Sequence, residues 1–219
     1  YEQHFVVREG AYAHISTGAA TKLAEMRYNY SGLKQVFELE KNAYLEYLPE
    51  PTIPCRHTRF IADTAIRIAP SATLFYSEVY MSGRKYFDGG ETFQYDILSV
   101  CSHAERPDGE QLFREKFIIR PGACPPGTLG AMNGYDVFAN VIVMTPPEHA
   151  DRIYEATPAF IDRDRRLAAG ITRLPNDAGL LYKVLGEETG PVKKLIREFC
   201  SSVRLEVKGR PLPEEFPWR

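Results

Sequence analysis

Two short motifs in this sequence pair a cysteine with a histidine. Cys55 and His57 flank one arginine, and Cys101 and His103 flank one serine. Residues two apart on an extended segment point the same way, so each pair could offer one thiolate and one imidazole to a metal ion. Neighbouring segments would then form a Cys2His2 site. The alternative is that the cysteines are buried and the histidines belong to polar loops.

Two glutamates are placed where a charged side chain is costly. Glu78 lies in the expected strand Thr73–Met81 and shares its side with a leucine and two tyrosines. Glu115 lies in the expected strand Leu112–Arg120 and shares its side with two phenylalanines and an isoleucine. A carboxylate on an apolar strand face must be paired or hydrated, and it often has a functional purpose.

Three interpretations of this glutamate pair stay open. The acids could line a polar interior, or they could form ion pairs with Arg84 and Arg114 in a purely structural β module. They could also be the acid and base of a glycosidase built on a β-solenoid. The last is disfavoured, because the sequence lacks the exposed aromatic platform and the cleft rich in Asp and Asn that such an enzyme would need.

Two further segments are candidates for contact with a partner. The tip Ser82–Glu91 holds paired glycines and carries Arg84 and Glu91. The proline-rich C-terminal end carries Trp218, which we expect to dock on the body of the protein or on a partner.

The composition is typical of a folded globular chain and does not by itself indicate a class of ligand or reaction. The chain has 219 residues, 44% of them hydrophobic, and a formal net charge of −2, which does not indicate a nucleic acid or an anionic membrane as partner. No apolar run approaches the ~20 residues of a membrane span, and no signal peptide is visible. The GxSxG, Walker, GxGxxG, HExxH and CxxC motifs are absent. Four scattered cysteines favour a reduced, cytoplasmic protein.

The elements that would position these residues are mainly strands. Segments rich in aromatic and β-branched residues predict strands over Leu33–Leu39, Phe60–Ile68, Thr73–Met81, Phe93–Val100, Leu112–Arg120, Tyr135–Met144 and Leu180–Leu185. Apolar residues at helical spacing predict a helix over Pro191–Val203 and a shorter one over Pro147–Ala156. We therefore expect a mainly β fold, a large β-sandwich or solenoid-like sheet system with one or two C-terminal helices.

A weak internal repeat supports this architecture. Three strand ends are followed by turn-prone residues and an alanine, at Ala11, Ala43 and Ala72, and Ala123 stands in a fourth such place. We interpret these turns as hairpin-like layers of one sheet system, stacked like a β-solenoid. We expect a single domain over residues 1–219. Because the chain opens on Tyr1 inside an apparent strand, we expect its N-terminal part to be incomplete.

An ordered series of motifs makes the chain similar to a known family. The motifs are GAATK at Gly18–Lys22, LEYLPEPTI at Leu45–Ile53, APSA at Ala69–Ala72, Gly83-Arg84, and GETF at Gly90–Phe93. In this order they resemble the UreD/UreH family of urease accessory proteins over nearly the whole chain. Ser77 stands where the family has a tryptophan, KLAEMR replaces its KFYRS run, and its upstream glycine-rich segment is missing.

The resemblance implies a non-catalytic maturation factor with a mostly β fold. Members bind UreF, through it the GTPase UreG, and apo-urease, and the assembly helps insert nickel into the urease active site. An internal nickel passage is implied for the family, and Glu78 and Glu115 fall where its acidic residues would lie. The resemblance thus implies no tightly bound cofactor and at most transient Ni2+, held loosely by oxygen ligands.

Overall fold

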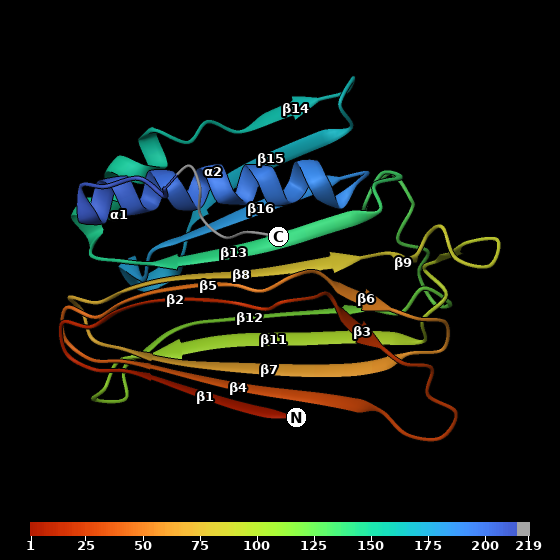
Figure 1. The fold of residues 1–219 in the computed structure, drawn as a ribbon, viewed down its shortest axis with the longest axis horizontal. Coiled ribbons are helices and arrows are strands. Elements are labelled where there is room, and N and C mark those ends of the chain that lie inside the picture. Colours follow the sequence, from red (N-terminus) through yellow and green to blue (C-terminus); the bar gives the residue numbers. More distant parts are fainter. Residues whose placement is uncertain (214–219) are drawn as a thin grey trace.

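The computed structural model describes residues 1–213, and it has three layers (Figure 1). Two β-sheets, here called sheet A and sheet B, face each other, and two helices cover the other side of sheet B. The predicted mainly β fold with helices in the C-terminal third is confirmed.

Sheet A has five strands in the order β1-β4-β7-β11-β12. Their bounds are Glu2–Val7, Ser31–Leu39, Arg59–Ile68, Ile97–Glu105 and Gln111–Ile119. The first four strands pair in parallel, and β12 is antiparallel to β11.

Sheet B has nine strands, seven of them in the order β14-β15-β16-β13-β8-β5-β2, and β3 and β6 extend it beside β8. In that order the seven bounds are Phe160–Asp162, Leu167–Arg173, Leu180–Gly186, Val137–Met144, Thr73–Met81, Tyr44–Leu48 and Tyr12–Ser16. The strand β3 is Thr21–Leu23, and β6 is Thr52–Pro54. The remaining short elements are β9 (Gly83–Arg84), β10 (Glu91–Thr92) and the 3-10 turn Pro175–Asp177.

The first half of the chain winds like a solenoid, because it alternates between the two sheets. Each new strand pairs in parallel with the strand that the chain last placed in the same sheet, as β5 does with β2 and β8 with β5. The turns between sheets stack. Gly10 N–H donates to Lys41 O (2.9 Å), and Asn42 N–H donates to Ser71 Oγ (3.1 Å). Stacking was predicted correctly, but the turns are not hairpins, since each joins strands of opposite sheets. The segment around Ala123 follows an antiparallel strand and does not join this stack.

One predicted strand, Phe93–Val100, begins later in the structure. Residues Phe93–Tyr95 are not a strand: Phe93 has a φ of +53°, and β11 begins only at Ile97. Pro49 and Pro51 follow β5. They interrupt pairing between β5 and β8, and Thr52 of β6 resumes it opposite Tyr80.

The helices α1 (Pro147–Glu155) and α2 (Thr189–Lys208) cover the outer side of sheet B. The α1 prediction is confirmed to within one residue, and α2 extends the predicted helix at both ends. It ends at Gly209, whose φ of +67° is the left-handed conformation of a C-cap. Buried residues of α2, including Phe199, pack on outward-facing side chains of sheet B such as Phe75 and Tyr182.

Between the sheets, the apolar interior is divided in two. One cluster lies toward the stacked turns and contains Phe37, Ile66 and Ile142. The other lies toward the opposite strand ends and contains Phe60, Val100 and Tyr80. The side chains between these two clusters are polar.

Candidate functional site

A row of polar side chains crosses the interior between the two apolar clusters, and we call it the polar belt. Each contributing strand has one polar residue at an inward position, with apolar inward residues on both sides. The polar belt consists of Gln35, Thr64, Ser102 and Glu115 from sheet A and of Glu78, Asn140 and Lys183 from sheet B.

Strand register brings these residues side by side. In sheet A, Thr64 is opposite Gln35 on one side and Ser102 on the other, and Ser102 is opposite Glu115. In sheet B, Asn140 is opposite both Glu78 and Lys183. Directly opposed residues of paired strands face the same side of a sheet, so each sheet carries a continuous polar row.

Glu78 is the most deeply buried carboxylate of the polar belt, with 7% of the residue exposed. Its Oε1 accepts a hydrogen bond from the Tyr76 hydroxyl (2.8 Å) and another from the Tyr80 hydroxyl (3.3 Å). Burial raises the pKa of Glu78 to about 7, although these tyrosine hydroxyls act in the opposite direction. The Glu115 carboxylate adds to the increase. Glu78 therefore exchanges a proton near neutral pH.

Hydrogen bonds connect Glu78 to sheet A through the interior. The Tyr76 hydroxyl lies 3.1 Å from Thr64 Oγ1 and 3.1 Å from Gln35 Oε1. Gln35 Nε2 donates to the Tyr47 hydroxyl (2.9 Å) and to Gln3 Oε1 (2.7 Å). These contacts satisfy buried polar groups and fix their orientation.

A hollow of about 390 Å³ opens at the Glu78 end of the polar belt. The buried residues Glu78, Tyr76 and Gln35 line it, and Gln3 and Glu50 line it as well. It lies where the prolines after β5 interrupt the sheet. This interruption leaves room between the strands, so Glu78 is buried and still borders a cavity.

At the other end, Glu115 forms an ion pair between the sheets. Lys183 Nζ donates to Glu115 Oε1 at 2.5 Å, and the Glu115 side chain is 25% exposed. Glu115 lies on the edge strand β12 and Lys183 on β16, so the ion pair links sheet A to sheet B.

The interpretation that Arg84 and Arg114 pair with these two glutamates is not supported. Lys183, rather than Arg114, pairs with Glu115, and Arg84 pairs with Glu91. Within residues 1–213, Glu78 has hydrogen-bonding neighbours but no cationic partner within ion-pair distance. The described residues that line its hollow do not include Glu115, so the geometry gives no support to a glycosidase with both acids in one cleft.

The two cysteine–histidine motifs do not form a shared metal site. Cys55 and His57 lie in the turn before β7, and the His57 ring pairs with Asp96 (3.3 Å). Cys101 and His103 lie within β11, and the His103 ring is 3.7 Å from an Asp63 oxygen. No group of three or more metal-ligating side chains occurs in the part of the chain that the structure describes. All four cysteines are free.

Arg84 and Glu91 stabilise the tip rather than face outward. Arg84 Nε and Nη2 donate to the two Glu91 carboxylate oxygens at 2.7 and 2.6 Å, and Glu91 is 3% exposed. The large hydrophobic residues that the tip exposes are instead Tyr86 (80%) and Phe87 (51%). Trp218 lies outside the described residues.

The sequence did contain a signal for the missed members of the polar belt. Gln35, Thr64 and Asn140 each stand in a strand where the inward residues two before and two after are apolar. This polar position recurs at the same level in neighbouring strands. Aligning the predicted strands by their inward faces would have shown a polar row across the sheets.

The fold and the site define a two-sheet, partly solenoidal β protein whose interior is crossed by polar and charged side chains. Its sequence matches the family model described as UreD urease accessory protein over residues 1–219, and the chain belongs to this family. None of the helices within residues 1–213 has the length and apolar character needed to cross a membrane.

Individual relatives agree with this assignment. The chain is 48% identical over 206 residues to urease accessory protein UreD 2 of Brucella suis biovar 1 (strain 1330), covering 94% of this chain and 68% of the relative. It is 46% identical over 220 residues to urease accessory protein UreD of Yersinia enterocolitica, covering 98% of this chain and 68% of the relative.

Proposed function

We propose that this chain is a non-catalytic urease maturation factor that assists the insertion of nickel into the urease active site. Membership of the UreD family supports the link to urease. The observation that carries the nickel role is the polar belt, because it places two carboxylates across an otherwise apolar interior. Nickel is the cargo of this process and does not stay on the chain.

The chemistry of the polar belt suits brief contact with a divalent cation. Glu78, Glu115 and the neutral side chains between them offer oxygen atoms, and no thiolate belongs to the row. Oxygen donors without a closed coordination sphere hold nickel loosely enough to release it. With its pKa near 7, Glu78 can give up its proton when a cation approaches from the hollow.

The partners in this proposal are UreF, UreG through UreF, and the apo-urease subunits. The tip Ser82–Glu91 supports a contact with UreF, because Tyr86 and Phe87 are exposed and lie on a segment that the Arg84–Glu91 ion pair holds in place. Aromatic side chains on a fixed surface are frequent anchors of protein interfaces.

The double variant Glu78→Gln/Glu115→Gln tests the nickel role. Glutamine keeps the size and some of the hydrogen bonds but removes the negative charge. Co-expressed with urease and its accessory proteins, this variant should give a normal yield of the accessory complex and a urease with less nickel and less activity. Nickel content of purified urease is the measurement.

Glu105→Gln is the matched control. Glu105 also forms an ion pair on sheet A, with Arg67 at 2.8 Å, but it points away from the interior. Nickel loading should be unchanged in this variant. If the double variant assembles well and urease still receives its normal nickel, the polar belt is ruled out as a nickel path. If the variant protein is less stable while the nickel content of urease is unchanged, the polar belt has a structural role only.

A further inference from the structure

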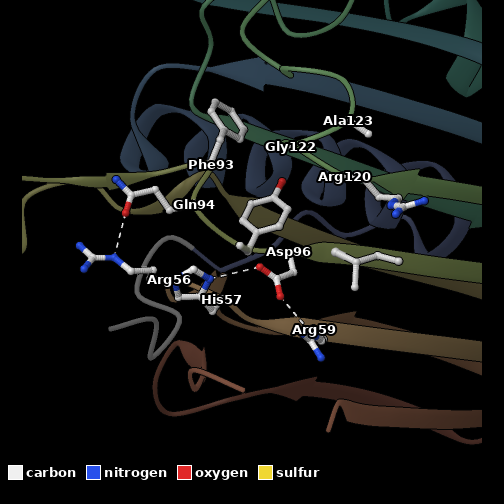
Figure 2. A pocket seen from close by; sticks show the side chains of 11 residues that line it. Arg56, His57, Arg59, Phe93, Gln94, Asp96, Arg120, Gly122 and Ala123 are labelled. Carbon is white, nitrogen blue, oxygen red and sulfur yellow. Dashed lines mark hydrogen bonds and ion pairs between the residues drawn. The ribbon is translucent and has the colours of Figure 1, made fainter. Parts of the chain in front are cut away.

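A basic hollow, whose lining residues include none of the polar belt, lies at the strand ends of sheet A. Figure 2 shows the side chains that line it. Arg59 begins β7, Asp96 precedes β11, and Arg120 follows β12. These three ends meet because β7 and β11 run parallel and β12 returns antiparallel beside them. Arg56 and His57, in the turn before β7, also line the hollow. The hollow has a volume of about 830 Å³, and we call it the basic basin.

Positive charge exceeds negative charge in the basic basin. Arg56, Arg59 and Arg120 line it, and Asp96 is the one carboxylate among the described residues of its lining. Asp96 accepts from Arg59 Nε (2.8 Å) and contacts the His57 ring (3.3 Å). Its single charge cannot neutralise three guanidinium groups.

Two of the arginines are held in place through Nε, and their terminal NH2 groups can still donate hydrogen bonds to a ligand. Arg59 uses Nε for Asp96, and Arg56 uses Nε for Gln94 Oε1 (2.9 Å). Arg56 also lies 3.8 Å from Glu91, which is already held by Arg84. Within residues 1–213, the Arg120 side chain has no carboxylate partner. A guanidinium fixed through Nε still presents its terminal NH2 groups in the geometry that binds a carboxylate.

A second hollow lengthens this surface. It shares His57, Arg59 and Asp96 with the basic basin, and its further lining residues include Glu25, Arg27 and Tyr28. Tyr28 is 96% exposed. The combined surface has four arginines and two carboxylates, so its net charge is positive.

We propose that the basic basin and its extension toward Tyr28 are a docking surface for an acidic segment of a partner protein. The surface is long and open, whereas small-molecule sites enclose most of their ligand. A free anion bound here would stay hydrated and screened. An extended polypeptide with several carboxylates can contact the arginines together and cover Tyr28, as aromatic anchors are covered in interfaces. The inference does not depend on nickel transfer.

A direct test uses the whole chain and a fluorescently labelled oligoglutamate peptide as probe, with fluorescence anisotropy as the readout. The variant Arg56→Gln/Arg120→Gln should weaken binding about tenfold, because it removes two charges from the basin. Arg163→Gln/Arg165→Gln removes two exposed arginine charges elsewhere and should change binding less than about twofold. Binding by the unchanged chain should also weaken as salt rises.

Three outcomes would overturn the proposal. The first is equal weakening by the basin and control variants, which would mean unspecific attraction. The second is unchanged affinity in the basin variant. The third is saturable binding of inorganic phosphate alone that the basin variant abolishes, because this would identify a small-anion site. Tyr28→Ser, at an exposed position, should weaken peptide binding without affecting folding, and it provides a second test.

Discussion

Lys183 and Glu115 lie on strands of opposite sheets, and their Nζ and Oε1 atoms are 2.5 Å apart at one end of the polar belt. The ammonium neutralises Glu115 and repels other cations from it. We expect Lys183→Met to free this carboxylate and to raise the affinity of the purified chain for Ni2+ by roughly threefold to tenfold. Isothermal titration calorimetry with Ni2+, for the parent chain and the variant, measures this affinity.

The matched control for this prediction is Arg67→Met. Arg67 and Glu105 are exposed to 54% and 29%, close to the 52% and 25% of Lys183 and Glu115, but their ion pair lies on the outer side of sheet A. Equal increases in nickel affinity would show only that any freed carboxylate attracts nickel. The stability cost of either variant should be small, about 1 kcal/mol or less, because both pairs are partly exposed.

Glu78 should make the protein less stable as pH rises. Its pKa is about 7 in the folded state and 4.5 in the reference state, so between these values the folded chain binds more protons than the unfolded chain. The free energy of unfolding then decreases with increasing pH, by about 3 kcal/mol in total from this group. Glu78→Gln should remove the decrease. Urea unfolding at pH 5 and pH 8, for the parent chain and the variant, measures the difference.

Glu105→Gln is the control, because Glu105 changes the free energy of unfolding with pH in the opposite direction. The hydrogen bond from Arg67 lowers the pKa of Glu105, so its contribution to stability is present at neutral pH and lost as pH falls. A Glu78→Gln variant with the same pH dependence as the parent chain would contradict the assigned environment of Glu78.

The solenoidal half of the fold could be predicted because its pattern is local. Ala11 and Ala43 are 32 residues apart, and the paired residues Tyr12 and Tyr44 show the same offset. Its content of aromatic and β-branched residues predicted β8 with its observed bounds, Thr73–Met81. The strand Leu167–Arg173 was missed because its small residues and glycine carry little strand preference, and its pairing with β16 decides its conformation.

The candidate site could be predicted only in part. Glu78 and Glu115 were found because an acid on an apolar strand face is unusual in any single strand. Lys183 was missed because a lysine in an alternating strand normally points to water, and only the contact between sheets shows its position. The proposed arginine partners were near in sequence, whereas Lys183 is 68 residues from Glu115.

Arg84→Met should destabilise the tip, because Glu91 would keep a buried charge without its bidentate partner. Losing one partner of such a pair costs about 3 kcal/mol, here reduced by the nearby Arg56. The double variant Arg84→Met/Glu91→Met should recover part of this loss, since it removes both charges. A double-mutant cycle from urea unfolding measures the coupling. Purely additive effects would show that the pair contributes nothing to the tip.

Gly83 provides the sharpest test of the tip's structure. Its φ is +147°, and a Cβ atom built there would lie 1.8 Å from the carbonyl oxygen of Glu91. Because that oxygen belongs to the backbone of the paired strand β10, Gly83→Ala must separate β9 from β10. We expect a loss of several kcal/mol, or local unfolding of the tip with faster tryptic cleavage after Arg84 and Lys85.

Gly18→Ala is the matched comparison, since Gly18 has no positive φ in the left-handed range and no atom within 4 Å of an added Cβ. This variant should keep the parent stability to within about 0.5 kcal/mol and the parent digestion pattern. Equal tolerance of alanine at both positions would mean that β9 and β10 do not approach as closely as the structure shows. The exposed rings of Tyr86 and Phe87 would then lack the rigid support that the proposed contact with UreF requires.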